Sequence, residues 1–172
     1  MKLPVKHITI LPALIFFCYN FCVAQKDSTK TRHSILKVAR QVSRGKTVDR
    51  GPVGFSATLT KQFDRFIFLW NNATDNELVA LTNYKSAVVR AYAFEILVLK
   101  GYSGVKTILN QHIADNAVIH IRSGCINSTA PVNFYFLQLL TPGMNDKNLS
   151  VKLTTVEVEA IKRKMMEAKA MK

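Results

Sequence analysis

The side chains of this chain that could do metal or nucleophilic chemistry are few and far apart in the sequence. His112, His120 and Cys125 form the cluster that suggests a metal site. Their separations of eight and five residues match neither the i, i+4 pair of a helical ligand set nor the usual spacing of zinc ligands. We therefore expect no metal and no cofactor.

A second set of residues has the types needed for covalent catalysis. Cys125, His120 and Asp115 supply a thiol, a base and an orienting acid, but nothing in the sequence brings the three within hydrogen-bond reach. The segment 101–104 has two glycines but lacks the lysine and the preceding strand of a phosphate-binding loop. These observations predict that the protein is not an enzyme, and we assign no catalytic, cofactor-binding or metal-binding residue.

Residues 1–24 have the three parts of a secretory signal peptide. Two lysines give a positive start, Ile8 to Val23 form an apolar run, and the small residue Ala24 precedes Gln25 and a charged stretch. We expect cleavage after Ala24. The mature protein would then work in the periplasm or outside the cell.

Two other interpretations of this segment stay open. An uncleaved segment would be a membrane anchor, although the run is short for a hydrocarbon core of roughly 30 Å. Lipidation of Cys18 or Cys22 would need a small residue before the cysteine, where Phe17 and Phe21 stand. Cleavage leaves Cys125 as the one cysteine, so we expect no intramolecular disulfide and a thiol buried as a small hydrophobe.

The formal charge of +13 is concentrated toward the ends of the chain. Residues 25–54 combine many Lys and Arg with Gly and Pro, which predicts a basic flexible linker. A short basic amphipathic helix is an alternative within it. Its apolar residues at helical spacing are Ile35, Val38, Ala39 and Val42, and Lys37, Arg40 and Arg44 lie on other faces. Such a helix would need a membrane surface or the main domain to hold it.

Residues 55–172 show helical periodicity, and we predict one all-α domain. Helices are expected over Ala57–Trp70, from the capping box Thr74–Glu77, from Ser86 to Lys100, around Val105–Ile113, over Ala117–Asn127, from Pro131 to Pro142, and over 154–170 from the capping box Thr154–Glu157. Val118 to Ile121 also suit a strand, but a lone strand would have no partner, so we prefer a helix there. In the first helix Phe66, Ile67, Phe68 and Leu69 point all round the axis. That helix should therefore be buried or face a partner.

The stretch from Ser86 to Gly101 resembles a HEAT repeat. Val89-Arg90 match the Val-Arg pair that opens the second repeat helix, and Ala93, Leu97 and Gly101 follow at the expected places. The resemblance implies a short antiparallel array of helical hairpins, a HEAT-like α-solenoid fragment, in which Val105–Asn127 and Pro131–Thr141 are degenerate further units. The alternative is an irregular helical bundle.

The resemblance also implies a role for Arg90, which should hydrogen-bond a carboxylate or backbone carbonyls of a neighbouring unit. It implies a scaffold or binding role for the protein but names no ligand. We therefore predict an exported, non-enzymatic helical-repeat scaffold or protein-binding module. The alternative is a peripheral envelope protein held to anionic lipid or glycan by its basic segments, 26–50 and the last helix. We infer no nucleic acid and no small-molecule substrate.

Overall fold

The computed structural model describes residues 33–143 and 150–170 of the chain. Residues 33–44 are helical and lead into the strand β1, Thr47–Val53. The helices α2, Lys61–Asn72, α3, Asp75–Thr82, α4, Ala87–Leu99, and α5, Val105–Gln111, come next. The strands β2, Val118–Gly124, and β3, Ile126–Pro131, are followed by the helices α6, Val132–Leu140, and α7, Thr155–Ala170.

The three strands form one mixed sheet in the order β1-β2-β3. β1 runs parallel to β2, with Thr47 opposite His120 and Asp49 opposite Arg122, and β2 and β3 form an antiparallel hairpin. Val48 and Ile119 are buried, whereas most of β3 is exposed. The sheet thus has one packed face and one face open to solvent, as mixed and antiparallel sheets often do.

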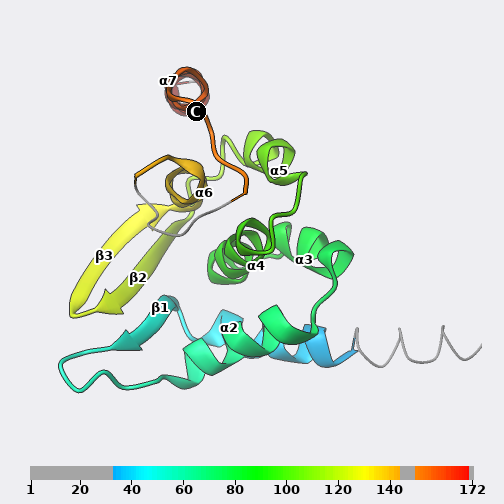
Figure 1. Cartoon of the computed structure of the whole chain (residues 1–172), viewed down its shortest axis with the longest axis vertical. Helices are drawn as coiled ribbons and strands as arrows, with labels where there is room; N and C mark the ends of the chain where they lie inside the picture. Colours follow the sequence, from blue (N-terminus) through cyan, green and yellow to red (C-terminus); the bar gives the residue numbers. More distant parts are fainter. Residues whose placement is uncertain (1–32, 144–149, 171–172) are drawn as a thin grey trace, which may run out of the picture.

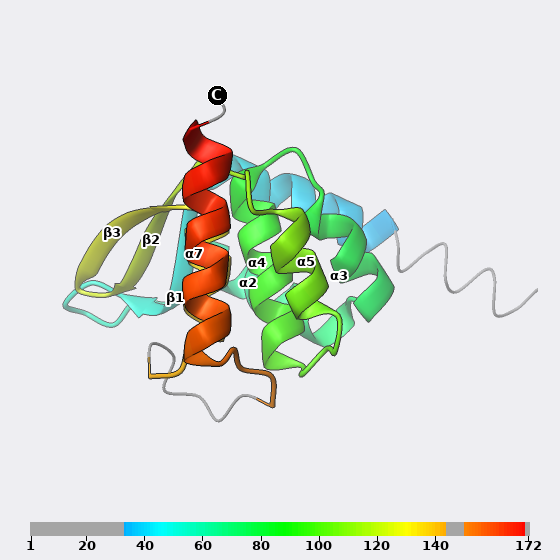
Figure 2. The same cartoon turned by 90° about the horizontal axis from the view of Figure 1, so that it is seen from above.

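The centre of the core is α4, which lies between α7 at one end of the molecule and α2 at the other (Figure 1). Ten of its 13 residues are buried. The ring of Phe94 stacks on that of Phe136 from α6, and Tyr92 packs against Phe66 from α2. Seen from the α7 end, α5 and α3 lie on one side of α4 and the sheet extends on the other side (Figure 2).

Local signals set the helix ends largely as the sequence predicts. Thr74 and Glu77 form the expected capping box of α3. Thr154 and Glu157 do the same before α7: the backbone N–H of each residue donates to the side chain of the other, at 2.7 and 3.2 Å. Gly101 follows α4 with a φ of +72°, a left-handed conformation that glycine adopts without strain.

The prediction of an all-α fold, a HEAT-like α-solenoid fragment with a flexible basic N-terminal arm, is wrong. The protein has an α/β fold, because the segments 47–53, 118–124 and 126–131 pair as a sheet. The helix expected over Ala117–Asn127 is replaced by β2, the turn and the start of β3. The strand at Val118 does have partners, which are β1 and β3. β1 lies in the segment 25–54, whose composition predicted a linker.

The basic amphipathic helix inside that segment is present over residues 33–44. Its apolar residues Ile35, Ala39 and Val42 are buried in the core, so the domain itself covers its apolar face. Gln62 of α2 donates a hydrogen bond to the carbonyl of Val42 at 3.1 Å and to that of Thr47 at 3.0 Å. This side chain ties the end of the helix and the start of β1 to α2.

The predicted signal peptide and residues 25–32 lie outside the described residues. Within 33–143 and 150–170, the structure contains no helix that is both long and apolar enough to span a bilayer.

Candidate protein-binding groove

The residues considered for catalysis and metal binding are engaged or separated in the fold. Asp115 and His112 do meet, with His112 Nδ1 and Asp115 Oδ2 3.3 Å apart. His120 lies on β2, and Cys125 is exposed in the turn between β2 and β3, so the prediction of a buried thiol is wrong. Among the described residues, no three His, Cys, Asp or Glu side chains gather in a way that could hold a metal ion.

Arg90 binds a carboxylate and backbone carbonyls, the kinds of acceptor that the resemblance to a HEAT repeat implied, although the described residues form no repeat array. Its guanidinium donates two hydrogen bonds to the carboxylate of Asp115, at 2.7 and 2.8 Å, and others to the carbonyls of Tyr84 and Lys85. Burial raises the pKa of the Asp115 carboxyl, but hydrogen bonds from His112 and Arg90 and the Arg90 charge outweigh it and hold the pKa below its usual range. This network joins α4 to the segment that follows α5.

A second ion pair connects two strands of the sheet. The guanidinium of Arg122 binds both carboxylate oxygens of Asp49, at 2.8 and 2.7 Å, and Thr60 donates a further hydrogen bond to Asp49. Burial raises the pKa of Asp49, yet the bonds from Arg122 and Thr60 leave it below the ordinary value. The Tyr92 hydroxyl accepts from the backbone N–H of Asp49 and donates to its carbonyl, which fixes β1 on α4.

Glu95, one turn after Tyr92 on α4, is buried and takes part in a third ion pair. Its carboxylate accepts a hydrogen bond from Arg50 at 3.1 Å and one from the hydroxyl of Tyr135 at 2.8 Å. Burial and the nearby carboxylate raise the pKa of Tyr135 well above its usual value. Each charged group in these networks has its partner within the fold. The networks around Asp49 and Glu95 hold the sheet to α4 and α6. The groups that could recognise another molecule lie elsewhere.

A groove runs between α7 and the region where β2, β3 and α6 meet. It has a volume of about 440 Å³. Its apolar lining comes from four elements: Val118 from β2, Pro131 at the end of β3, Phe134 from α6, and Met165 and Met166 from α7. The thioether side chains can adapt to differently shaped apolar ligands.

Three of the lining side chains are unusually exposed for large hydrophobic residues. The exposed fraction is 62% for Val118, 41% for Phe134 and 65% for Met166. Lys169, Asn116 and Asn133 form the polar part of the lining, and no carboxylate contributes to it. Lys169 has no ion-pair partner among the described residues. In the part of the chain that the structure describes, the groove therefore combines an apolar floor with one unpaired cation, Lys169, at its edge.

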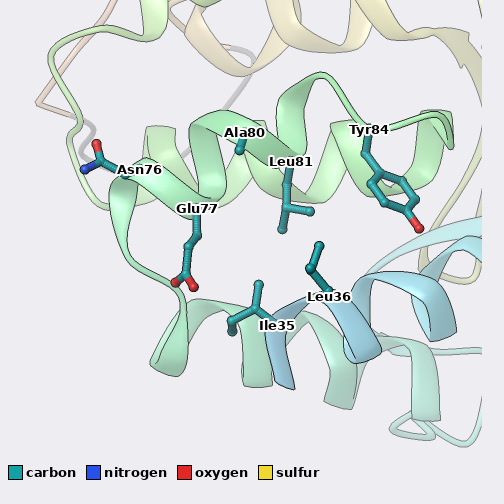
Figure 3. A pocket seen from close by; sticks show the side chains of 7 residues that line it. All are labelled: Ile35, Leu36, Asn76, Glu77, Ala80, Leu81 and Tyr84. Atoms are coloured by element: carbon teal, nitrogen blue, oxygen red, sulfur yellow. The ribbon is translucent and has the colours of Figure 1, made fainter. Parts of the chain in front are cut away.

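Other hollows are less suited to a partner. Figure 3 shows a crevice of about 180 Å³ between the helical residues 33–44 and α3, in which Ile35 and Leu81 lie opposite each other. Its one carboxylate, Glu77, is already bound to Thr74 in the capping box. A polar hollow of about 430 Å³ on the open face of the sheet includes His120 and Arg122, of which Arg122 is held by Asp49.

Sequence reasoning missed the groove. Val118 and Met166 lie 48 positions apart in different elements, so nothing local connects them. An available signal is the apolar pair Met165 and Met166, which stands between the cations 162–164 and Glu167.

Comparison with known proteins does not assign the chain to a protein family. No protein-family model matches the sequence, and no characterised protein is significantly similar to it.

Proposed function

We propose that this protein is an exported, non-enzymatic binding module, and that the groove beside α7 holds an apolar segment of a partner protein. The observation that carries the proposal is the exposure of Val118, Phe134 and Met166 around one groove. Exposed apolar side chains that cluster, rather than occur singly, mark interaction surfaces.

The charge of the lining indicates the chemistry of the partner. Lys169 is the one charged residue among the described residues that line the groove, and the neighbouring residues of α7 include the exposed cations Arg163 and Lys164. A second copy of this chain would bring like charges together. An apolar segment with a carboxylate beside it would match both the floor and the edge of the groove, so we propose such a segment as the occupant.

The test uses photo-crosslinking in the cell envelope of the source organism. A photoreactive residue at Met166 or Phe134 should crosslink the same partner protein. The matched control is Val156, which is also on α7 and is 80% exposed but does not line the groove. No crosslink at Met166, or equal crosslinking at Val156, would contradict the proposal.

The identified partner is then purified and titrated against variants. Met166→Asp should raise the Kd by at least about tenfold, because it places a charge on an apolar contact. Val156→Asp should leave the Kd within about twofold of the wild-type value. Equal effects of the two substitutions would rule out the groove as the binding site.

The export part of the proposal rests on residues 1–24 and has its own test. N-terminal analysis of the protein isolated from its host should find Gln25 as the first residue. Retention of residues 1–24 would instead make this a membrane-anchored protein.

A further inference from the structure

The end of the molecule opposite α7 carries a second unpartnered surface. It is formed by the helical residues 33–44 and by α2, which lie at the lower end of the molecule in Figure 1. We use the name basal face for six outward residues of these two elements and of the segment just before α2: Lys37, Arg40, Arg44, Leu59, Ile67 and Phe68.

The first half of the basal face is a cationic stripe. Lys37, Arg40 and Arg44 follow one another at helical spacing, and all three are exposed. They lie opposite Ile35, Ala39 and Val42, which are buried in the core. None of the three cations has an ion-pair partner in the part of the chain that the structure describes.

The second half is apolar. Ile67 is 40% exposed and Phe68 37%, and together with Leu59 they line a shallow hollow of about 480 Å³. The carboxylate in this lining is Asp64. The two elements are in contact, because the Gln62 side chain of α2 donates a hydrogen bond to the carbonyl of Val42 in the helical residues 33–44.

We infer that the basal face binds the surface of a bilayer that contains anionic phospholipids. Cations near such a surface are attracted to the phosphate headgroups, and exposed Ile and Phe side chains can enter the boundary between headgroups and acyl chains. The basal face offers both cations and exposed apolar side chains, on two neighbouring elements. A polyanion such as a nucleic acid or an acidic glycan would engage the cations and leave Ile67 and Phe68 in water.

The fold limits which side of the amphipathic helix at residues 33–44 can contact a membrane. Because the domain covers Ile35, Ala39 and Val42, the helical residues 33–44 present only their basic side to a membrane. The apolar contact comes from α2 instead. The inference does not depend on the groove beside α7, because α7 itself lies at the opposite end of the molecule from α2 (Figures 1 and 2).

The test measures co-sedimentation of the exported form of the protein with vesicles. Binding is expected to vesicles of phosphatidylcholine and phosphatidylglycerol in equal parts, to be weak with phosphatidylcholine alone, and to weaken as salt is added. The triple variant Lys37→Gln, Arg40→Gln, Arg44→Gln should bind about 100-fold more weakly, from about fivefold for each cation. Its control, Lys152→Gln, Arg163→Gln, Lys164→Gln, at exposed positions outside the groove lining, has the same net charge and should bind within about twofold of the wild type.

The apolar half is tested separately. Ile67→Ser, Phe68→Ser should weaken vesicle binding by at least about tenfold, whereas Val156→Ser, Ile126→Ser, at exposed positions elsewhere, should not. Equal losses in the two charge variants would mean attraction by net charge alone and would overturn the inference. So would an unchanged affinity of the Ile67, Phe68 variant, or equally tight binding of polyphosphate in place of vesicles. Circular dichroism confirms that each variant is folded.

Discussion

Two helices of similar length, α4 and α7, have opposite relations to the rest of the molecule. Ten of the 13 residues of α4 are buried, and its polar side chains Arg90, Tyr92 and Glu95 each bind a different part of the chain. Of the 16 residues of α7, Val158 and Ile161 are buried. The comparison indicates that stability is concentrated around α4, while the surfaces available for binding lie on the elements that pack on one side only.

The largest expected contrast comes from the same substitution in each helix. Ile96→Ala in α4 should lower the free energy of unfolding by about 2–5 kcal/mol, because the side chain is fully buried and leaves a cavity. Ile161→Ala in α7 should cost less than about 2 kcal/mol, since a helix packed on one side can shift to close the gap. Urea denaturation with an unchanged m-value measures both. Equal losses would mean that α7 is as much part of the core as α4.

A smaller contrast is expected for two arginines. Arg90→Ala should lower the free energy of unfolding by about 1–3 kcal/mol, because the Asp115 carboxylate and two carbonyls lose their donors. Arg163→Ala, at an exposed position of α7, should change it by less than about 0.5 kcal/mol. A loss for Arg90→Ala as small as that for Arg163→Ala would show that the Asp115 network adds nothing to stability.

The smallest effect concerns the pH dependence of the α4 network. The folded pKa of Asp115 is below its usual value, so its contribution to stability is present above the unfolded pKa of about 4 and is lost as the pH falls through the folded pKa. In Asp115→Asn, the free energy of unfolding should therefore fall less steeply below about pH 4 than in the wild type. Thermal unfolding across this pH range measures the slope. Parallel curves would mean that the Asp115 carboxyl has the same pKa in both states.

Local features of the structure could be predicted from the sequence, and pairings between distant segments could not. The capping boxes at Thr74 and Thr154 depend on side chains three residues apart. The resemblance to a HEAT repeat implied the kinds of acceptor that Arg90 binds. In α2, Phe66 and Leu69 are buried while Ile67 and Phe68 are exposed, so this helix is not buried all round.

The sheet was missed for a physical reason. The residues Val118 to Ile121 suit a strand, but no partner strand can be recognised in the sequence. β3 is exposed over most of its length, so its sequence shows no apolar alternation, and β1 contains Gly51 and Pro52, which are typical of a linker. The candidate groove depends on the same pairing, because the hairpin places Val118 and Pro131 beside each other.

The parallel pairing of β1 with β2 has a consequence for the order in which the chain can fold. Asp49 and the Arg122 that neutralises it are 73 residues apart, so neither the sheet nor this ion pair can form before most of the chain is available. Closing so long a loop costs entropy before any contact repays it, and folding dominated by such contacts is slow. Among the described residues β1 is the first strand, and it must therefore wait for β2 before it can pair.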